Sequence, residues 1–221
     1  MAEVEVRGDI ISNDDKWIYD WLEWDSTCPA DVKAAIEAKP EGEMLTVLID
    51  SRGGSVFAGQ EIYSLLHGRD DVEIKVQSIA ASAASVIAMA NHCEISPVGM
   101  IMIHNVQMSG ASGDYRDMQK NAEILKRMNA ALAAAYIEKT GKEQDEILRL
   151  MDKETWLTAN QALELGFVDG IEGGVETYVA ATTGMRLTEE IRQKVIAEKA
   201  AADEIEAKKH DLLSDLDAFG V

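Results

Sequence analysis

The stretch Met44-Leu-Thr-Val-Leu-Ile-Asp-Ser-Arg-Gly-Gly-Ser55 is the strongest indication of the fold, because it passes from a buried strand through a glycine turn towards a helix. Met44 to Ile49 is an almost continuous apolar run of strand length, which is typical of a central strand covered on both faces. Gly53-Gly54 supplies the turn, and the segment from Ala58 to Leu66 has a helical apolar period. This order predicts the first half of a parallel crossover unit.

The chain beyond this stretch continues the alternation of strands and helices. Val72 to Val76 alternates as a strand, and Ala80 to Ala90 is an alanine-rich apolar stretch that we expect to form a buried helix. Met100 to Ile103 is a further buried strand. A long helical period runs from Tyr115 to Lys139, and Thr140-Gly141 ends it. This spacing predicts a layered α/β fold around a parallel sheet.

Composition and charge exclude several classes of protein. The chain has 221 residues, of which 47% are apolar, so we expect a folded domain. It carries 21 basic and 40 acidic side chains, and the net charge of −19 argues against nucleic acid and against anionic membranes as partners. We expect no membrane helix and no secretory signal, and therefore a cytoplasmic protein. Cys28 and Cys93 have no Cys-x-x-Cys partner, so we expect neither a zinc site nor a disulfide framework. We also expect no metal and no cofactor.

The last part of the chain differs in composition from the rest. From Met185 to Val221 charges are dense, alanine is frequent, and apolar residues keep only a loose helical period. We therefore expect residues 1–184 to form one domain and residues 185–221 to form a charged helical C-terminal appendage.

Three local features carry groups that could do chemistry. Gly53-Gly54 leaves backbone N–H groups free to face a developing negative charge, although a tight turn explains the same glycines. Ser82 opens the expected buried helix, where the N–H of Ala83 could stabilise an oxyanion; a helix cap or a small packing residue is the alternative. His104 follows a buried strand, where open α/β sheets place reacting groups, but a hydrogen-bonded structural histidine would fit there too.

Four ordered blocks of sequence resemble the proteolytic subunit of Clp protease, the ClpP family. The blocks, which cover roughly Val4 to Ile171, are Asp50-Ser-Arg-Gly-Gly-Ser-Val-Phe-Ala-Gly-Gln-Glu-Ile-Tyr63, Ala80-Ala-Ser82, Met102-Ile-His104 and Trp156-Leu-Thr-Ala-Asn-Gln-Ala-Leu-Glu-Leu-Gly-Phe-Val-Asp169. The run from Ala80 to Ala90 is the signature of the phage and prophage branch of head-maturation (prohead) proteases, and it makes this branch the closest resemblance.

The resemblance implies a serine endopeptidase with the ClpP/crotonase fold, which consists of repeated ββα units and a protruding helix–strand handle. Ser82 matches the family nucleophile, with Ser85 as the less favoured choice, and His104 matches the general base. The groups that match the oxyanion hole and the substrate-pairing strand are Gly53, Gly54 and Ala83.

The third member of the triad departs from the family pattern. In the family an aspartate stands five residues before the alanine of the Leu-Ser/Thr-Ala block, and the same count from Ala159 gives Glu154 here. A glutamate can orient a histidine if its extra methylene fits, and Asp152 is the alternative third member. Arg52 also replaces a common proline and puts a cation beside the oxyanion glycines, and Val106 stands where a proline often occurs.

The resemblance also implies an assembly. We expect a homo-oligomer, a hexameric or heptameric ring, that encloses the active sites and admits unfolded or scaffold-type polypeptides. The handle would comprise the Tyr115–Lys139 helix and a glycine-containing strand from Gln107 to Gly113; the apolar positions of this helix exceed what one buried face requires. Candidate partners are phage head or scaffold proteins and an ATP-driven (AAA+) unfoldase, although we expect the axial loops that engage an unfoldase to be missing. The expected location is the cytoplasm of a bacterial or phage-infected bacterial cell.

Two alternative functions stay open. A crotonase-like acyl-CoA enzyme would share the fold and the oxyanion glycines, but the Ala-Ala-Ser and Met-Ile-His blocks speak against it. A catalytically silent ClpP-like assembly subunit would keep the fold with a misformed triad, and the glutamate at position 154 keeps this alternative open.

Overall fold

The structure is a computed structural model that describes residues 2–173, 191–200 and 208. The chain divides into two compact units, residues 1–184 and residues 185–221. In the second unit residues 191–200 are helical, and most of the expected C-terminal appendage lies outside the described residues. The first unit carries all the residues that we selected as candidates for the functional site.

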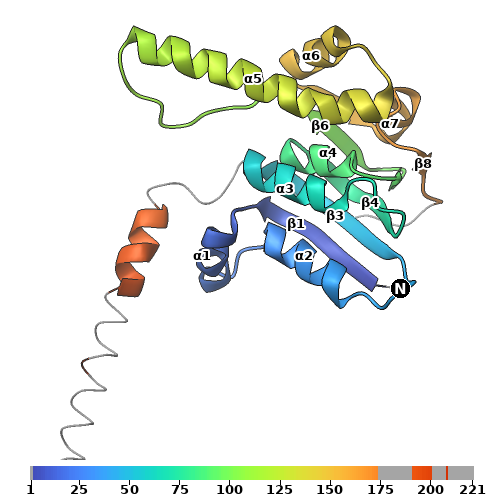
Figure 1. Ribbon diagram of the computed structural model, residues 1–221, viewed down its shortest axis with the longest axis horizontal. Coiled ribbons are helices and arrows are strands. Elements are labelled where there is room, and N and C mark those ends of the chain that lie inside the picture. Colours follow the sequence, from blue (N-terminus) through green and yellow to red (C-terminus); the bar gives the residue numbers. More distant parts are fainter. Residues whose placement is uncertain (1, 174–190, 201–207, 209–221) are drawn as a thin grey trace, which may run out of the picture. The chain divides into compact units, whose positions relative to one another are not determined.

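An eight-stranded sheet lies at the centre of the described part of the first unit (Figure 1). The main path of the sheet runs through β2 (Ser26–Thr27), β1 (Ala2–Ile10), β3 (Leu45–Gly54), β4 (Val72–Ala81), β5 (Cys93–Ile95) and β8 (Gly170–Ile171), all parallel. The sheet forks at β4, because its first half pairs with β5 and its second half with β6 (Met100–Ile103). β7 (Thr155–Thr158) pairs antiparallel to β6. The predicted α/β fold with a parallel sheet is therefore confirmed.

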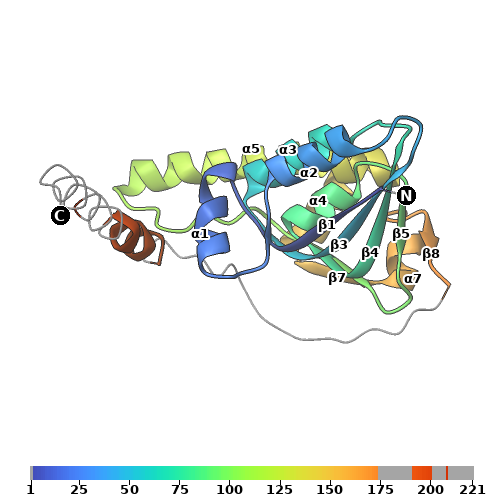
Figure 2. The same ribbon diagram turned by 90° about the horizontal axis from the view of Figure 1, so that it is seen from below.

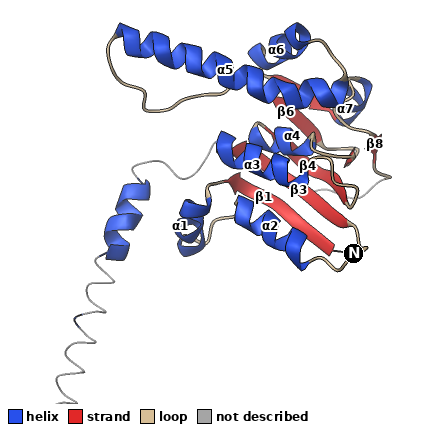
Figure 3. Ribbon diagram, in the orientation of Figure 1, coloured by secondary structure: helices blue, strands red, loops and turns tan. Residues whose placement is uncertain are grey.

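Helices α2 (Pro29–Ala38), α3 (Val56–Leu66) and α4 (Ala83–Ala88) lie together on one face of the sheet, as Figure 2 and Figure 3 show. The core between these layers is aliphatic, and Ile49, Ile62, Ile74 and Ile87 are fully buried within it. A short 3-10 turn (Asn13–Asp15) and α1 (Lys16–Trp21) connect β1 to β2, while α6 (Gln144–Asp152) and α7 (Ala159–Glu164) flank β7 in sequence.

The long helix α5 (Tyr115–Thr140) packs only through its C-terminal part. Asp114 caps its start, and Gly141 ends it at φ 68°, in the left-handed conformation that glycine adopts readily. The buried residues are Leu132, Ala133, Ala135 and Tyr136. The N-terminal half extends away from the sheet (Figure 1), and the side chains of Met118 and Ile124 there are 38% and 39% exposed.

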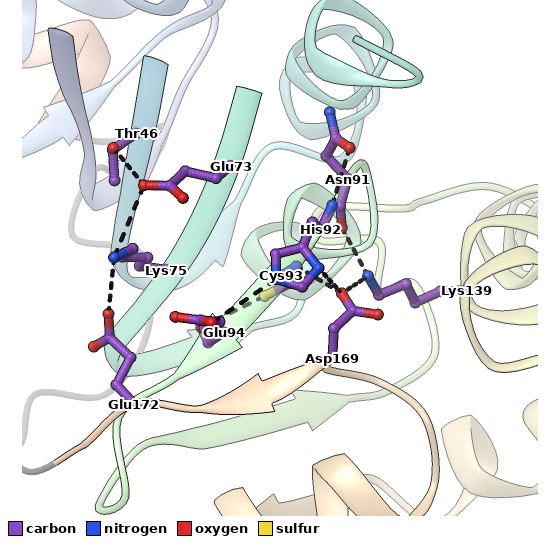
Figure 4. A network of polar contacts seen from close by, with 10 residues as sticks. All are labelled: Thr46, Glu73, Lys75, Asn91, His92, Cys93, Glu94, Lys139, Asp169 and Glu172. Carbon is purple, nitrogen blue, oxygen red and sulfur yellow. Dashed lines mark hydrogen bonds and ion pairs between the residues drawn. The ribbon is translucent and has the colours of Figure 1, made fainter. Parts of the chain in front are cut away.

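A network of polar contacts anchors the C-terminal end of α5 to the edge of the sheet (Figure 4). Lys139 Nζ donates to the carboxylate of Asp169 and, over 2.7 Å, to the carbonyl of Asn91. Asp169 Oδ2 also accepts from the N–H of Cys93 at 2.7 Å. Burial by itself would raise the pKa of Asp169, but the bonds from Lys139 and Cys93 hold this pKa below its ordinary value. Asp169, the last residue of the fourth family block, is therefore a structural anchor.

Three predicted elements differ in the structure. Gly53-Gly54, predicted as a turn, belongs to β3, because the pairing with β1 continues to Gly54. The helix predicted from Ala80 begins only at Ala83, because the backbone of Ile79–Ala81 pairs with β6 and extends strand β4. Pairing with a neighbouring strand here outweighs the helix propensity of alanine. The strand predicted for Gln107–Gly113 is wrong for this single chain, since the segment has no regular structure and no described strand pairs with it.

Candidate active site

Ser82 lies at the sharp turn between β4 and α4. Its backbone has φ 54° and ψ −123°, a conformation that is rare for a residue with a side chain and that often marks a functional site. The N–H of Ser82 donates to the carbonyl of Met102 at 2.9 Å, which holds the turn against β6. Ser82 is partly accessible, whereas Ser85, the alternative nucleophile, is fully buried and out of reach of a substrate.

His104 follows the last residue of β6 and is half-buried. Because β6 runs parallel to β4, with Met102 opposite Ala81, the chain leaves both strands at the same edge of the sheet. His104 Nε2 consequently lies 2.7 Å from Ser82 Oγ, although the two residues are 22 positions apart. The contact has the length of a good hydrogen bond.

The environment of His104 favours its neutral form. Burial of the ring lowers the pKa of His104 from its ordinary value, and the negative charge of Glu154 partly opposes this effect. A neutral imidazole carries one proton, so that when Nε2 accepts from Ser82 Oγ the proton resides on Nδ1. His104 is therefore able to accept the Ser82 proton at neutral pH.

Glu154 and Asp152 occupy different places beside His104. The antiparallel register puts Ile103 opposite Thr155, and continuing it by one residue brings Glu154 to the level of His104. Glu154 is close enough for its charge to act on the imidazole, but no hydrogen bond joins it to His104 within the described residues. Its carboxylate is exposed and accepts a hydrogen bond from Trp156 Nε1 at 3.3 Å.

The carboxylate of Asp152 is engaged by the residue that follows the histidine. Asp152 Oδ1 accepts from Asn105 Nδ2 at 2.8 Å. Between the two candidates for the third member, the strand register and the electrostatic effect on the imidazole therefore favour Glu154.

Gly53 brings β3 against Ser82. Its φ is 98°, and a Cβ atom there would lie 2.7 Å from Ser82 Cβ and 2.9 Å from Ala83 N, so only glycine permits this approach. As the first residue of α4, Ala83 has no intrahelical acceptor for its N–H. The N–H of Gly53, in contrast, donates to Ser51 Oγ at 3.1 Å in this structure.

Close contact with the neighbouring strand β1 explains why position 54 is a glycine. A Cβ atom at Gly54 would lie 2.2 Å from the carbonyl oxygen of Ile10, with which the N–H of Ser55 forms a 2.7 Å hydrogen bond. The glycine pair thus combines two close approaches, Gly53 towards Ser82 and Gly54 towards β1.

Two side chains that the sequence analysis did not select also support the site. Ser51 Oγ accepts from the N–H of Gly53 and donates to the carbonyl of Gly8 at 2.6 Å. Asn129 of α5 accepts from the N–H of Val106 at 2.7 Å and so holds the loop that follows His104. The contact of Ser51 with Gly8 and that of Asn129 with Val106 join segments that are distant in sequence, and no local pattern indicates them.

The part of the chain that the structure describes contains no cluster of three or more His, Cys, Asp or Glu side chains suited to a metal ion. None of its helices has the length and apolar character needed to cross a membrane. Cys28 and Cys93 are both free and buried.

Comparison with known proteins identifies the family. The family profile described as Clp protease matches residues 32–174. ATP-dependent Clp protease proteolytic subunit 1 of Chlamydia muridarum (strain MoPn / Nigg) is 30% identical over 141 residues, which cover 62% of this chain and 73% of the relative. The protein of the same name from Chlamydia pneumoniae is also 30% identical over 141 residues, covering 62% and 74% of the two chains. The chain thus belongs to the Clp protease family.

Proposed function

We propose that this protein is a serine endopeptidase of the ClpP type that cleaves peptide bonds in unfolded or scaffold-type polypeptides. The observation that carries the proposal is the 2.7 Å contact between His104 Nε2 and Ser82 Oγ, in a member of a protease family. The burial that keeps His104 neutral supports its role as a base, and the positive φ of Ser82 fits a nucleophile presented on a sharp turn.

The reaction would proceed through an acyl-enzyme. His104 Nε2 takes the proton of Ser82 Oγ while this oxygen forms a bond to the carbonyl carbon of the substrate. The electron pair of the C=O bond moves to the carbonyl oxygen, and the N–H of Ala83 stabilises the resulting oxyanion. His104 then gives the proton to the amine nitrogen as the C–N bond breaks. Water, deprotonated by the same imidazole, hydrolyses the Ser82 ester and regenerates the enzyme.

Gly53 would be the second oxyanion donor. Its close approach to Ser82 and Ala83 supports this role. Because its N–H donates to Ser51 Oγ in this structure, substrate would have to share that proton or displace Ser51 from it. Gly54, which the resemblance places in the strand that pairs with substrate, would act by holding Gly53 in position against β1.

Glu154 would complete the triad as the carboxylate that stabilises the imidazolium of His104 during the reaction. Its charge raises the pKa of His104, as this role requires, and the β6–β7 register supports it over Asp152. In this role the exposed Glu154 side chain would leave Trp156 Nε1 and accept a hydrogen bond from His104 Nδ1.

The protein would act as a homo-oligomer, a hexameric or heptameric ring in which α5 forms the handle. The exposed apolar side chains on the protruding half of α5 support this assembly, since water-exposed apolar surface of this kind marks contact sites. The Gln107–Gly113 segment would gain a strand partner only from another subunit. The Ala80–Ala90 run supports the prohead branch, with phage head or scaffold proteins as substrates in a bacterial cytoplasm and an unfoldase as a less favoured partner.

A fluorophosphonate probe tests the activity, because only an activated serine reacts with it. The wild-type protein should be labelled at Ser82, and Ser82→Ala and His104→Ala should abolish the labelling. Ser64→Ala is the matched control, since Ser64 is an exposed serine of α3 whose hydroxyl bonds only within its own helix. Cleavage of fluorescein-labelled casein should follow the same pattern. A wild-type protein that neither reacts nor cleaves casein would overturn the proposal.

Two observations favour a second candidate, a catalytically silent assembly subunit. Glu154 makes no hydrogen bond to His104 among the described residues, and the N–H of Gly53 already has an acceptor. The same labelling experiment decides between the two functions, since a silent subunit would form the oligomer without reacting at Ser82.

A further inference from the structure

A buried pair of hydroxyl groups connects α5 to the turn that carries Ser82. Ser85 Oγ of α4 lies 2.8 Å from Tyr136 OH of α5 and 2.6 Å from the carbonyl oxygen of Ser82. The side chains of Ser85 and Tyr136 are 0% and 2% exposed, so water does not compete for these contacts. The proposed reaction does not use either hydroxyl.

The direction of the two hydrogen bonds follows from proton counting. A carbonyl oxygen can only accept, so the single proton of Ser85 Oγ is donated to Ser82 O. The contact between the two hydroxyls must then use the proton of Tyr136 OH, with Ser85 Oγ as the acceptor. Burial raises the pKa of Tyr136 and keeps the phenol protonated, as a donor must be. The result is a directed relay from Tyr136 through Ser85 to the carbonyl of Ser82.

This relay acts on the peptide unit that contains the oxyanion donor. The Ser82 carbonyl and the Ala83 N–H belong to one planar trans peptide, in which the two groups point in opposite directions. Fixing the carbonyl towards the interior therefore fixes the N–H towards the reacting side. The backbone N–H groups of Ser85 and Val86 also donate to this carbonyl, at 3.0 and 3.4 Å. The 2.6 Å bond from Ser85 Oγ is the shortest of the three contacts, and it acts on a residue with a strained positive φ. Hydrogen bonds to the carbonyl also polarise the peptide and strengthen its N–H as a donor.

We propose that Ser85 and Tyr136 are positioning residues that aim the Ala83 N–H at the oxyanion of the reaction. The inference rests on the proposed function and deepens it. It gives a role to the second serine of the Ala80–Ala90 run, and it links the catalytic turn to the base of α5, the proposed handle. Neither residue touches substrate, and both act through the Ser82–Ala83 peptide.

Steady-state kinetics with a short peptidyl-aminocoumarin, together with inhibition by the matching peptide aldehyde, test the relay. The aldehyde forms a tetrahedral adduct whose oxygen needs the same N–H as the transition state. Loss of a whole oxyanion donor costs about 100- to 1000-fold in kcat, so a donor that is present but less well oriented should cost about 10-fold. We expect Ser85→Ala to lower kcat and to raise the aldehyde Ki by this common factor, with KM unchanged.

The hydroxyl of Tyr136 should contribute less to kcat than that of Ser85, because Ser85 Oγ can still donate to the Ser82 carbonyl without it. Tyr136→Phe should lower kcat about threefold, and the double variant should match Ser85→Ala, since the two groups form one chain. The pH midpoint of kcat/KM should stay at the wild-type value, because His104 is untouched. Tyr63→Phe is the matched control: it removes a tyrosine hydroxyl that donates at 3.3 Å to Glu138 of the same helix α5, and it should leave kcat and Ki unchanged.

Reactive sites are counted by titration with the fluorophosphonate, so that unfolded protein does not enter kcat. The relay would be overturned if Ser85→Ala had the kcat and Ki of the wild type. It would also be overturned if kcat fell in Ser85→Ala without a rise in Ki, or if the effects of the two substitutions were strictly additive in the double variant. Should Ser85→Ala fail to fold, Tyr136→Phe carries the same comparison of kcat and Ki. A wild-type protein with no labelling and no cleavage would instead overturn the proposed function together with the relay.

Discussion

Replacing Gly53 by alanine measures how closely β3 must approach Ser82, the proposed nucleophile. At this position φ is 98°, and a Cβ atom would lie 2.7 Å from Ala81 O and 2.7 Å from Ser82 Cβ. These neighbours belong to a paired strand and to a buried turn, so they cannot move aside as a flexible side chain would. The substitution should therefore destabilise the fold and displace the catalytic turn.

The magnitude follows from two separate costs. A side chain in the left-handed backbone region costs about 1–2 kcal/mol, and forcing an extra carbon into a packed site costs about 1–3 kcal/mol. Gly53→Ala should thus lower the free energy of unfolding by about 2–5 kcal/mol. Gly68→Ala isolates the first cost, because Gly68 has φ 69° and a Cβ atom there would meet nothing within 4 Å. This control should lose only about 1–2 kcal/mol.

Urea unfolding at one fixed protein concentration measures both variants, and the rate of fluorophosphonate labelling reports on the site. Labelling of Gly53→Ala should slow at least about 100-fold, as expected when an oxyanion donor is displaced. Gly68→Ala should be labelled at the wild-type rate. The reasoning would be refuted if Gly53→Ala unfolded at the same urea concentration as Gly68→Ala and was labelled as fast as the wild type.

Further predictions concern the base, the anchor of α5 and the assembly. Because only the neutral imidazole of His104 acts as a base and burial lowers its pKa, kcat/KM should rise with pH around a midpoint below 6.5, the ordinary value. Glu154→Gln should move this midpoint lower still and reduce kcat, whereas Asp152→Asn should leave the midpoint unchanged. Asp169→Asn should cost about 1 kcal/mol of unfolding free energy at neutral pH. The folded-state pKa of Asp169 lies below its ordinary value, so the aspartate's contribution is present at neutral pH, and the difference between variant and wild type in urea unfolding should shrink as the pH falls through that pKa. Ile124→Asp, on the exposed half of α5, should reduce the sedimenting mass without changing the circular dichroism; an unchanged mass would argue against α5 as the handle.

Local patterns predicted much of the architecture correctly. The apolar run from Met44 became β3, and the predicted helix over Tyr115–Lys139 became α5 over Tyr115–Thr140, ended by Gly141 as expected. These elements were predictable because buried strands and amphipathic helices leave a period in the sequence, and because a left-handed glycine at the helix end is a local feature.

The boundary at Ser82 could not be predicted in the same way. Ala80 and Ala81 favour a helix by propensity, but the backbone hydrogen bonds of β6, about 20 residues further on, extend β4 to Ala81. A strand depends on a partner, and the period of one segment does not reveal which distant segment pairs with it. The Gln107–Gly113 segment shows the opposite effect. A strand was predicted there, but it does not form, since no strand of the described chain pairs with it.

The residue types of the candidate site and their order along the chain, from Gly53 through Ser82 and His104 to Glu154, can be read from the sequence. How these groups meet depends on contacts between remote segments. The parallel pairing of β4 with β6 brings His104 within 2.7 Å of Ser82, Ser51 Oγ donates to the carbonyl of Gly8, 43 residues earlier, and Tyr136 reaches Ser85 across 51 residues of chain. The physical reason is that hydrophobic periods and caps are encoded over a few neighbouring residues, whereas each of the contacts of His104 and Tyr136 depends on packing between elements that are remote in sequence.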